Sequence, residues 1–501
     1  MSGGRPSRLG RMVHWALLTL AVILLSLAGW VRFRFGAVSL EQILLNLPTQ
    51  GGSQGSGSAA LVTEAAALCL GAPVLLMGAA LLVTSWRRRR NGSDGPVRRT
   101  PAASLGAFFT ALVVFLSVTG VPQYATALLM DRSIAPYYLR PAVAAVAERP
   151  HNLVTIYLES GENTFADTSV FGQNLLSELD QVTAGWARYD GLEQYPGGGW
   201  TMSGLVSTGC GIPLKSQLLT DGMNLNNLGE ALTTYLPGAT CLGDILSEQG
   251  YTNVFMGGAH TRFAGKDTYL STHGYDRVLG LDEWEADGEA RSQISVWGLS
   301  DQRLFERAAD VVDDLDESGR PFNLTLLTLD THEPGGVFPG CSTDDDLAMA
   351  TATKCSMRAV AGFIDHLTSR GILDDTVVTV MGDHLKATSE GGFFKDELER
   401  TPDRTIIYRV WSPDSVRFTR DRADQLSVLP TTLELLGLAP PDGRAGLGVS
   451  FVGQHDLGGT ALELDEAEYR TVVTSPSSGL YRELWGGQEP EHLPAATATP
   501  R

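Results

Sequence analysis

Basic residues are few in this chain, and their shortage is uneven. The 501 residues include 38 Lys and Arg against 57 Asp and Glu, a net charge of −19. The first 130 residues hold 11 of the basic and 3 of the acidic residues, so the remainder carries 27 against 54, or −27. Phosphate backbones attract basic surfaces, and this composition therefore argues against nucleic acid as a partner.

Long apolar stretches are confined to the first 130 residues, at 15–30, 65–86 and 102–121. Each is close to the roughly 20 residues that a helix needs to cross a bilayer. The first alone could be a signal peptide, but two more stretches follow and no clear small-residue cleavage site is present. We predict a three-helix transmembrane anchor at 1–122, a proline-containing connector at 123–150, an exported domain at 151–485 and a disordered tail at 486–501.

Arginine placement predicts the orientation of this anchor. Three arginines precede the first stretch, and six lie between the second and third. The loop at 31–58 contains only Arg32 and Arg34, with a Gly/Ser tract at 51–58. Because cytoplasmic loops carry the excess of positive charge, we expect a cytoplasmic N-terminus and, after three crossings, an exported remainder.

Only five cysteines are present, and no spacing among them resembles a zinc ribbon. Cys69 lies inside the second apolar stretch, where it serves as a small apolar residue. The other four lie in the exported part, where an oxidising compartment favours disulfides. Proximity favours pairing Cys210 with Cys241 and Cys341 with Cys355, although four cysteines allow three pairings and free thiols are the alternative.

Strand and helix patterns alternate after residue 150. Runs of β-forming residues predict strands at 153–158, 252–256, 322–328, 377–380 and 405–410. Helical patterns at 242–249, 301–316 and 356–369 are followed by Gly250, Gly319 and Gly371, as C-terminal caps should be. This alternation, with strands apolar on both faces, predicts an α/β fold in which helices sandwich a mostly parallel sheet.

Polar residues with acid-base or metal chemistry follow three of these strands. Glu159 ends the first, His332 ends the third, and the pair Asp383-His384 follows the fourth. Ligands bind at the carboxyl ends of strands in open α/β sheets. A carboxylate and an imidazole from adjacent residues can both reach one divalent cation, and mixed oxygen and nitrogen ligands suit Mn²⁺ or Zn²⁺ better than Ca²⁺. For Glu159 alone, the alternative is a surface or capping carboxylate.

Thr201 is the candidate nucleophile. It follows three glycines and Trp200 and is expected at the start of a helix through Thr208. A hydroxyl is a poor nucleophile unless a base or metal lowers its pKa, and the alternative is a plain N-cap threonine. His332 could protonate a leaving group, and Lys266 could contact a phosphate; the alternatives are a structural histidine and a solvated lysine.

In this order, the segments resemble the lipoteichoic acid synthase and phosphoglycerol transferase I family, a sulfatase-like branch of the alkaline phosphatase superfamily. The resemblance covers residues 150–448. It is carried by TMSGLVSTGCGIPL (201–214), FAGKDTYLSTHGYD (263–276), WGLSD (297–301), TLDTH (328–332) and LPTTLELLG (429–437). The first two are closest to the phosphoglycerol transferase I version.

This resemblance implies roles for individual residues. One divalent cation, Mn²⁺ first and Mg²⁺ or Zn²⁺ as alternatives, is expected on Glu159, Thr201, Asp383 and His384, with Thr201 as nucleophile. His332 is expected to contact the phosphoglycerol group. Lys266 stands where the synthases have Arg, and Ala264 stands where they have Trp.

The implied function is a transferase of the bacterial inner membrane with a periplasmic catalytic domain. It would move phosphoglycerol from phosphatidylglycerol to a periplasmic glucan, or another polyol, through a covalent threonine intermediate. The alternatives are a lipid phosphodiesterase and a phosphoethanolamine transferase. A type I sulfatase is disfavoured because the Cys/Ser-x-Pro-x-Arg motif is missing. A non-enzymatic sensor or glucan-binding module is disfavoured because Thr201 and the Asp383-His384 pair are present.

Overall fold

The computed structural model describes residues 8–35, 59–91, 101–130, 132–215, 232–333, 335–341, 347–388 and 392–486. These residues form two compact units, one reaching to Leu129 and the other beginning at Met130. The Gly/Ser tract at 51–58 and the predicted tail after Gly486 lie outside the described residues.

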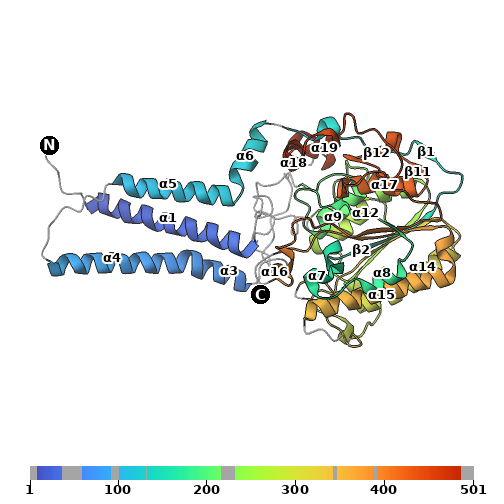
Figure 1. Ribbon diagram of the computed structural model, residues 1–501, viewed down its shortest axis with the longest axis horizontal. Helices are drawn as coiled ribbons and strands as arrows, with labels where there is room; N and C mark the ends of the chain where they lie inside the picture. The colour runs from blue at the N-terminus through green and yellow to red at the C-terminus, as the bar shows by residue number, and fades with distance from the viewer. Residues whose placement is uncertain are drawn as a thin grey trace. The chain divides into compact units, whose positions relative to one another are not determined.

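The N-terminal unit consists of long apolar helices (Figure 1). Helix α1 contacts both α4 and α5. The stretches Gly10–Phe33 and Thr63–Arg87 are long and apolar enough to cross a membrane, whereas Ala102–Val118 is shorter. All three predicted stretches are thus helical, but by length only two qualify as spans. The bounds are α1 Arg8–Phe35, α3 Ala59–Ala66, a π-helical turn Ala67–Gly71, α4 Ala72–Asn91, α5 Pro101–Val118 and α6 Val121–Met130.

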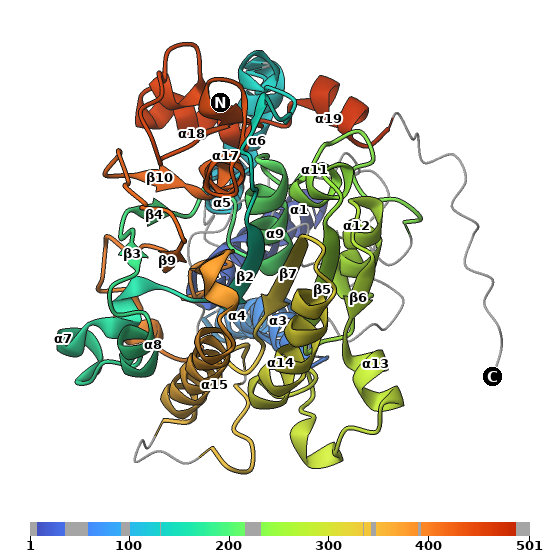
Figure 2. The same cartoon turned by 90° about the vertical axis from the view of Figure 1, so that its right-hand side faces the viewer.

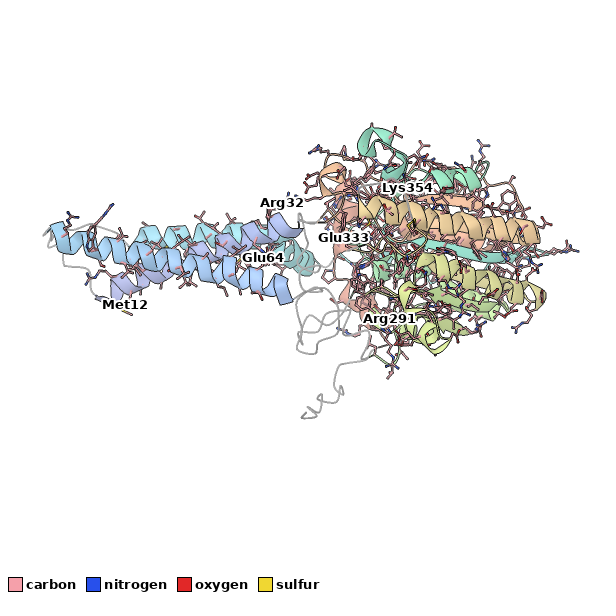
Figure 3. The ribbon with its side chains drawn as sticks, turned by 90° about the horizontal axis from the view of Figure 1, so that it is seen from below. Met12, Arg32, Glu64, Arg291, Glu333 and Lys354 are labelled. Atoms are coloured by element: carbon pink, nitrogen blue, oxygen red, sulfur yellow. A yellow bond between two sulfur atoms is a disulfide. The ribbon has the colours of Figure 1, made fainter. Side chains whose placement is uncertain are left out.

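Large apolar side chains on these helices point outward. Met12, labelled in Figure 3, is 69% exposed, and Leu75 and Leu82 are exposed to a similar degree. Soluble proteins seldom present apolar surface of this extent to water, whereas a hydrocarbon environment would bury it at no cost. The unit is therefore a candidate membrane anchor.

The second unit is built on a seven-stranded sheet of order β3-β9-β8-β2-β7-β5-β6. The five strands β8, β2, β7, β5 and β6 are parallel, while β9 runs antiparallel to β8 and β3 antiparallel to β9. Figures 1 and 2 show α14 and α15 on one face of the sheet and α9 and α17 on the other. The strand bounds are β2 Asn152–Leu158, β3 Ala187–Arg188, β5 Thr252–Gly257, β6 Arg277–Leu279, β7 Phe322–Leu327, β8 Thr376–Gly382 and β9 Tyr408–Trp411.

Shorter elements complete this unit. Two-stranded pairings join β1 to β11, β4 to β10 and β12 to β13. The helices are α7 Thr168–Phe171, α8 Ser177–Val182, α9 Thr201–Cys210, α11 Leu242–Glu248, α12 Lys266–Thr272, α13 Leu281–Ala286, α14 Asp301–Glu317, α15 Ala348–Arg370, α16 Lys395–Leu398, α17 Val428–Leu435, α18 Glu466–Thr474 and α19 Ser478–Leu484. The remaining strands are β1 Ala145–Val146, β4 Leu192–Glu193, β10 Ala423–Asp424, β11 Leu438–Ala439, β12 Arg444–Ala445 and β13 Gly448–Val449.

The predicted α/β fold with a mostly parallel sheet is confirmed. The central strands are buried along almost their whole length, as strands covered on both faces must be. Helix α14 buries Leu304, Ala308 and Val312 at four-residue spacing against the sheet, which is the pattern of an amphipathic helix. Gly319 and Gly371 have positive φ after α14 and α15, as expected for C-terminal caps.

The differences from the predicted elements lie at edges and ends. The strands β3 and β6 were not predicted, because two- and three-residue strands carry no periodic signal. Helix α15 begins at Ala348, earlier than the predicted 356, through a stretch whose Ala and Thr content masks the helical period. Strand β9 begins three residues later than the predicted strand at 405–410.

Both favoured disulfides are present in the second unit. The Cys210–Cys241 bond joins the end of α9 to the residue before α11, and the Cys341–Cys355 bond joins a loop to α15. Among the described residues Cys69 is the free cysteine, and it is buried. Proximity in sequence therefore predicted the pairing correctly.

Candidate active site

The sheet order brings three of the predicted site segments side by side. Strand β2 lies between β8 and β7, and Leu158 pairs with Gly382. The next residues, Glu159 and Asp383, therefore leave the same edge of the sheet as neighbours. Both side chains are buried, Asp383 completely. This edge is the carboxyl end of the parallel strands, where an open α/β sheet binds ligands.

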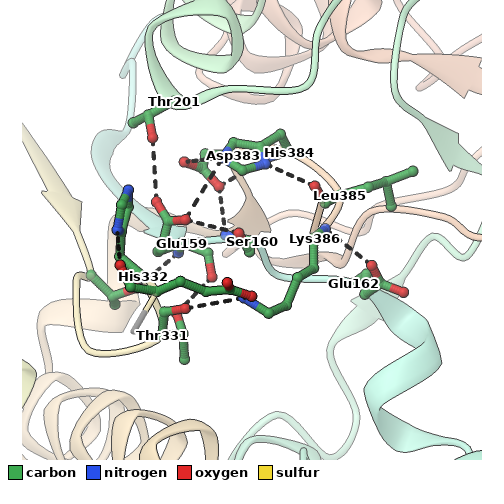
Figure 4. Close-up of polar contacts among 12 residues, drawn as sticks. Glu159, Ser160, Glu162, Thr201, Thr331, His332, Asp383, His384, Leu385 and Lys386 are labelled. Carbon is green, nitrogen blue, oxygen red and sulfur yellow. Dashed lines mark hydrogen bonds and ion pairs between the residues drawn. The ribbon is translucent and has the colours of Figure 1, made fainter. Parts of the chain in front are cut away.

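Thr201 reaches this edge from the start of α9. It is the first helical residue, while Trp200 occupies the cap position in an extended conformation. The side chain of Thr201 donates a hydrogen bond to Glu159 Oε2 over 3.3 Å (Figure 4). The hydroxyl thus faces the carboxylates instead of capping its own helix, and the capping alternative does not describe it.

The donor set fits a divalent cation. Glu159, Asp383 and His384 each offer a ligand atom, and these atoms lie within 4.8 Å of one another. Asp383 Oδ1 accepts hydrogen bonds from the backbone N–H groups of Ser160 and His384, but its buried Oδ2 has no hydrogen-bond partner. An orphaned carboxylate oxygen in a buried site is costly unless a cation satisfies it.

The ring of His384 is also oriented to bind a cation. His384 Nδ1 lies 2.8 Å from the carbonyl oxygen of Leu385, so this nitrogen donates and Nε2 keeps its lone pair. Nε2 lies 3.7 Å from Glu159 Oε1 and 3.6 Å from Asp383 Oδ2. A backbone acceptor that selects the tautomer in this way is the usual support of a metal-binding histidine.

Charges within the cluster shift the pKa values of its acids in opposite directions. Burial raises the pKa of Asp383 to about 7, and the neighbouring Glu159 adds to the rise while His384 opposes it. Burial also disfavours ionised Glu159, but His332, His384, the Ser160 hydrogen bond and Lys386 together bring its pKa to about 2. Burial lowers the pKa of His384, and the two carboxylates outweigh this and raise it. Two adjacent carboxylates that do not ionise together leave room for a cation to replace a proton.

His332 lies near the cluster but not at the end of a strand. Strand β7 ends at Leu327, and the chain then turns, so the prediction that His332 ends a strand is wrong. The turn forms because Thr328 accepts the backbone N–H of Glu159 and Thr331 donates to the Glu159 carbonyl oxygen. His332 Nδ1 lies 3.1 Å from the carbonyl oxygen of Glu333, which leaves Nε2 free to exchange a proton.

Lys266 is the first residue of α12 and is buried. Burial lowers its pKa to about 8, and the opposing charges of Glu159, Asp267 and Asp383 limit that fall. The lysine therefore belongs to the electrostatic environment of the site and is not a solvated surface cation. Ala264 nearby is also buried, in the left-handed backbone region.

An indole from another segment lies beside His332. The ring centroids of Trp297 and His332 are 4.2 Å apart, and Trp297 Nε1 donates to the Glu333 carbonyl oxygen over 2.8 Å. Phe263 packs edge to face near this indole, with ring centroids 6.3 Å apart. The motif at 297–301 marked Trp297 as part of the resemblance, but its contact with His332 depends on folding.

Comparison with known proteins places this site in a family. The sulfatase family model matches residues 192–438. Phosphoglycerol transferase I of Xanthomonas campestris pv. campestris is 33% identical over 74% of this chain and 52% of its own length. The protein of that name from Xanthomonas euvesicatoria pv. vesicatoria is 33% identical over 95% of this chain and 66% of its own. This chain is a sulfatase-like member of the phosphoglycerol transferase I family.

The resemblance stated from the motifs is therefore confirmed, and the relatives that confirm it are named as transferases. The chain spans about half the length of the first relatives it matches. A protein of the alkaline phosphatase superfamily from Vibrio parahaemolyticus shares the fold, with a TM-score of 0.51 and 19% identity over 72% of this chain and 97% of that one. Sulfatase-like enzymes use a divalent metal, in agreement with the donor set described above.

Sequence reasoning missed several residues of this family member's site. Ser160 adopts a left-handed conformation with φ of 56°, donates its hydroxyl to Glu159 Oε1 and its N–H to Asp383 Oδ1. Such a backbone conformation costs on the order of 1–3 kcal/mol and is typical of functional sites. Glu162 is fully buried and paired with Arg404, 242 residues away. No local pattern distinguishes these residues from other polar residues in loops.

Gly204 allows α9 to approach the Asp383 loop. A Cβ atom at this position would lie 2.1 Å from the Asp383 carbonyl oxygen. We expect Gly204→Ala to lower the free energy of unfolding by about 1–3 kcal/mol, because overpacking forces the helix or the loop to move. Activity should fall with it, although no functional group is removed. Thermal unfolding and initial rates measure the two effects.

The matched control is Gly362→Ala in α15, where an added Cβ atom meets nothing within 4 Å. This exposed helical position should become more stable by about 0.5–1 kcal/mol, since alanine is the better helix former. Equal behaviour of the two variants would contradict the close approach at Gly204.

Proposed function

We propose that this chain is a membrane-anchored, metal-dependent transferase that moves phosphoglycerol from phosphatidylglycerol to an acceptor hydroxyl. The acceptor class is a periplasmic glucan, and the intermediate is a phosphoglycerol ester of Thr201. One observation carries the proposal: the Thr201 hydroxyl is hydrogen-bonded to Glu159 inside a buried donor set suited to a divalent cation. The named relatives supply the class of reaction.

Four residues would hold the cation: Glu159, Thr201, Asp383 and His384. Mn²⁺ is the favoured ion, and Mg²⁺ and Zn²⁺ are alternatives, because two carboxylates, a hydroxyl and an imidazole mix oxygen and nitrogen donors. When bound, the cation lowers the pKa of the hydroxyl and offsets the charge of the phosphate.

In the first step the Thr201 oxygen attacks phosphorus, forming the Oγ–P bond. The bond between phosphorus and the diacylglycerol oxygen breaks. Glu159 accepts the hydroxyl hydrogen bond and so orients the Thr201 oxygen, and the hydroxyl proton passes to solvent. His332 in its protonated form donates the Nε2 proton to the departing diacylglycerol oxygen, while Nδ1–H stays on the Glu333 carbonyl. Lys266 offsets negative charge on the phosphate.

In the second step the acceptor hydroxyl attacks the same phosphorus. Its proton passes to His332 Nε2, the Oγ–P bond breaks, and the Thr201 oxygen takes a proton from solvent. Two displacements on one residue predict ping-pong kinetics. Water in place of the sugar would make the same site a phosphodiesterase, so the acceptor decides between transfer and hydrolysis.

The membrane anchor fits a lipid donor. We place the anchor at residues 1–122 with its N-terminus in the cytoplasm, and the catalytic domain at 151–485 on the periplasmic side of a bacterial inner membrane. Arginine placement supports this orientation, and the two long apolar helices support the anchor. Tethering the site to the membrane raises the local concentration of the donor.

The test is diacylglycerol release by the purified full-length chain in vesicles with Mn²⁺. Phosphatidylglycerol and phosphatidylethanolamine are compared as donors, each with and without an oligosaccharide acceptor. We expect diacylglycerol release from phosphatidylglycerol and not from phosphatidylethanolamine. The oligosaccharide should increase the rate of this release. Release from phosphatidylethanolamine alone would establish the phosphoethanolamine transferase instead, and release that no sugar changes would favour the phosphodiesterase.

A further inference from the structure

Lys386 is a buried cation that the mechanism above does not use. Only 4% of its surface is exposed. Its Nζ lies 3.2 Å from Glu333 Oε1 and 3.5 Å from the carbonyl oxygen of Thr331 (Figure 4). These partners are the two residues on either side of His332. A buried ammonium must be paired, and among the described residues its hydrogen-bond and ion-pair partners belong to the turn that carries the histidine.

The backbone of Lys386 is fixed independently of that turn. Its N–H donates to Glu162 Oε2 over 3.1 Å, and its carbonyl oxygen accepts from Arg404. Glu162 is fully buried and bound by Arg404. Lys386 is also two residues from His384 in sequence. It therefore extends from the loop of the cation ligands to the turn of His332.

The turn, residues Asp330–Glu333, has other supports, and at its start Asp330 exchanges two hydrogen bonds with Asp301. Thr331 Oγ1 donates to the Glu159 carbonyl oxygen, and the Trp297 indole donates to the Glu333 carbonyl oxygen. The Glu333 carboxylate, about one third exposed, also accepts from the backbone of Phe393. The contacts just named are hydrogen bonds, whereas the Lys386–Glu333 pair joins opposite charges. This pair connects the turn to the loop of Asp383 and His384.

We propose that Lys386 is a positioning residue, which through Glu333 and Thr331 holds His332 at the distance from the cation ligands that proton transfer requires. The proposal rests on the role given to His332 in the proposed function. Proton transfer demands hydrogen-bond distance, so a loosened turn would slow the reaction without removing any reacting group.

The test is a double-mutant cycle on diacylglycerol release by the full-length chain. Lys386→Met should lower kcat/KM by about 10- to 100-fold, as loss of a supporting interaction commonly does. In the His332→Ala background the same change should cost no more than about twofold, because its target is gone. Glu333→Gln should also lower kcat/KM, and in the His332→Ala background it should likewise change kcat/KM by no more than about twofold. Mn²⁺ affinity, measured by calorimetry, should not weaken in Lys386→Met.

Lys354→Met in α15 is the matched control, since it removes a part-buried lysine that bonds to Gln173 instead. It should leave kcat/KM within about twofold. If the losses in kcat/KM caused by Lys386→Met and His332→Ala multiply in the double variant, the proposal is overturned. Such a result would indicate direct contact between Lys386 and substrate. A loss of Mn²⁺ affinity would overturn it as well. Absence of diacylglycerol release from the unmodified chain would instead refute the proposed function.

Discussion

Thr201→Ala should abolish transfer, with kcat lowered by a factor on the order of 10⁴ or more. Removing the nucleophile of a covalent enzyme leaves only substrate binding and electrostatic stabilisation. Among the described residues, the Thr201 hydroxyl is the side-chain group of α9 that is hydrogen-bonded to Glu159. Diacylglycerol release from phosphatidylglycerol measures the effect.

Thr201→Ser is the control, because it keeps the hydroxyl at the first position of α9 and should keep activity within about tenfold. Rapid acid quenching of the unmodified chain should trap a peptide containing Thr201 that has gained one phosphoglycerol group. Thr201→Ala should yield no such peptide. Substantial release by Thr201→Ala would remove the nucleophile from the mechanism, and with it the covalent intermediate.

Glu159→Gln should have the second large effect, on metal binding. The substitution preserves size but removes one of two buried carboxylates facing His384. We expect Mn²⁺ affinity to fall at least about 100-fold, more than the loss of a supporting residue causes, and turnover to be undetectable at Mn²⁺ levels that saturate the unmodified chain. Calorimetric titration and initial rates measure these quantities.

Thermal unfolding separates this effect from misfolding. At a concentration 100 times its dissociation constant, Mn²⁺ should stabilise the unmodified chain by about 2.7 kcal/mol, and this increment should be missing in Glu159→Gln. Without metal, the variant should be less stable than the unmodified chain, since His332, His384 and Lys386 stabilise the ionised carboxylate of Glu159. An unchanged metal-dependent increment in Glu159→Gln would remove this carboxylate from the cation site. Ser160→Ala, which keeps both carboxylates, should retain most of the metal-dependent increment.

Some residues of the candidate site could not be predicted from the sequence, because their role depends on where they lie in the fold and not on their residue type. Ser160, Lys386 and Glu162 follow or flank recognised ligands, yet their sequence neighbourhoods resemble those of many surface loops. Their importance comes from contacts with residues more than 50 positions away, such as Glu162 with Arg404 and Lys386 with Thr331. Interactions of that range depend on the complete fold, which no window of sequence contains.

The sequence by itself determined the longer strands of the sheet, several of its helices and the chemistry carried at the ends of β2 and β8. Apolar runs such as 153–158 must be buried on both faces, and glycines at Gly319 and Gly371 end helices, because these preferences act over a few residues. The apolar stretches at 15–30 and 65–86 and the position of Thr201 at a helix start follow from the same local physics.

Only the tertiary structure decided which of these ends meet. The order β8-β2-β7 brings Asp383 beside Glu159, and a turn instead of a strand end carries His332. The indole of Trp297 and the ammonium of Lys386 reach that turn from separate segments. Strand order and loop contacts are set by how helices pack on both faces of the sheet and by which buried charges find partners, and these are properties of the whole domain.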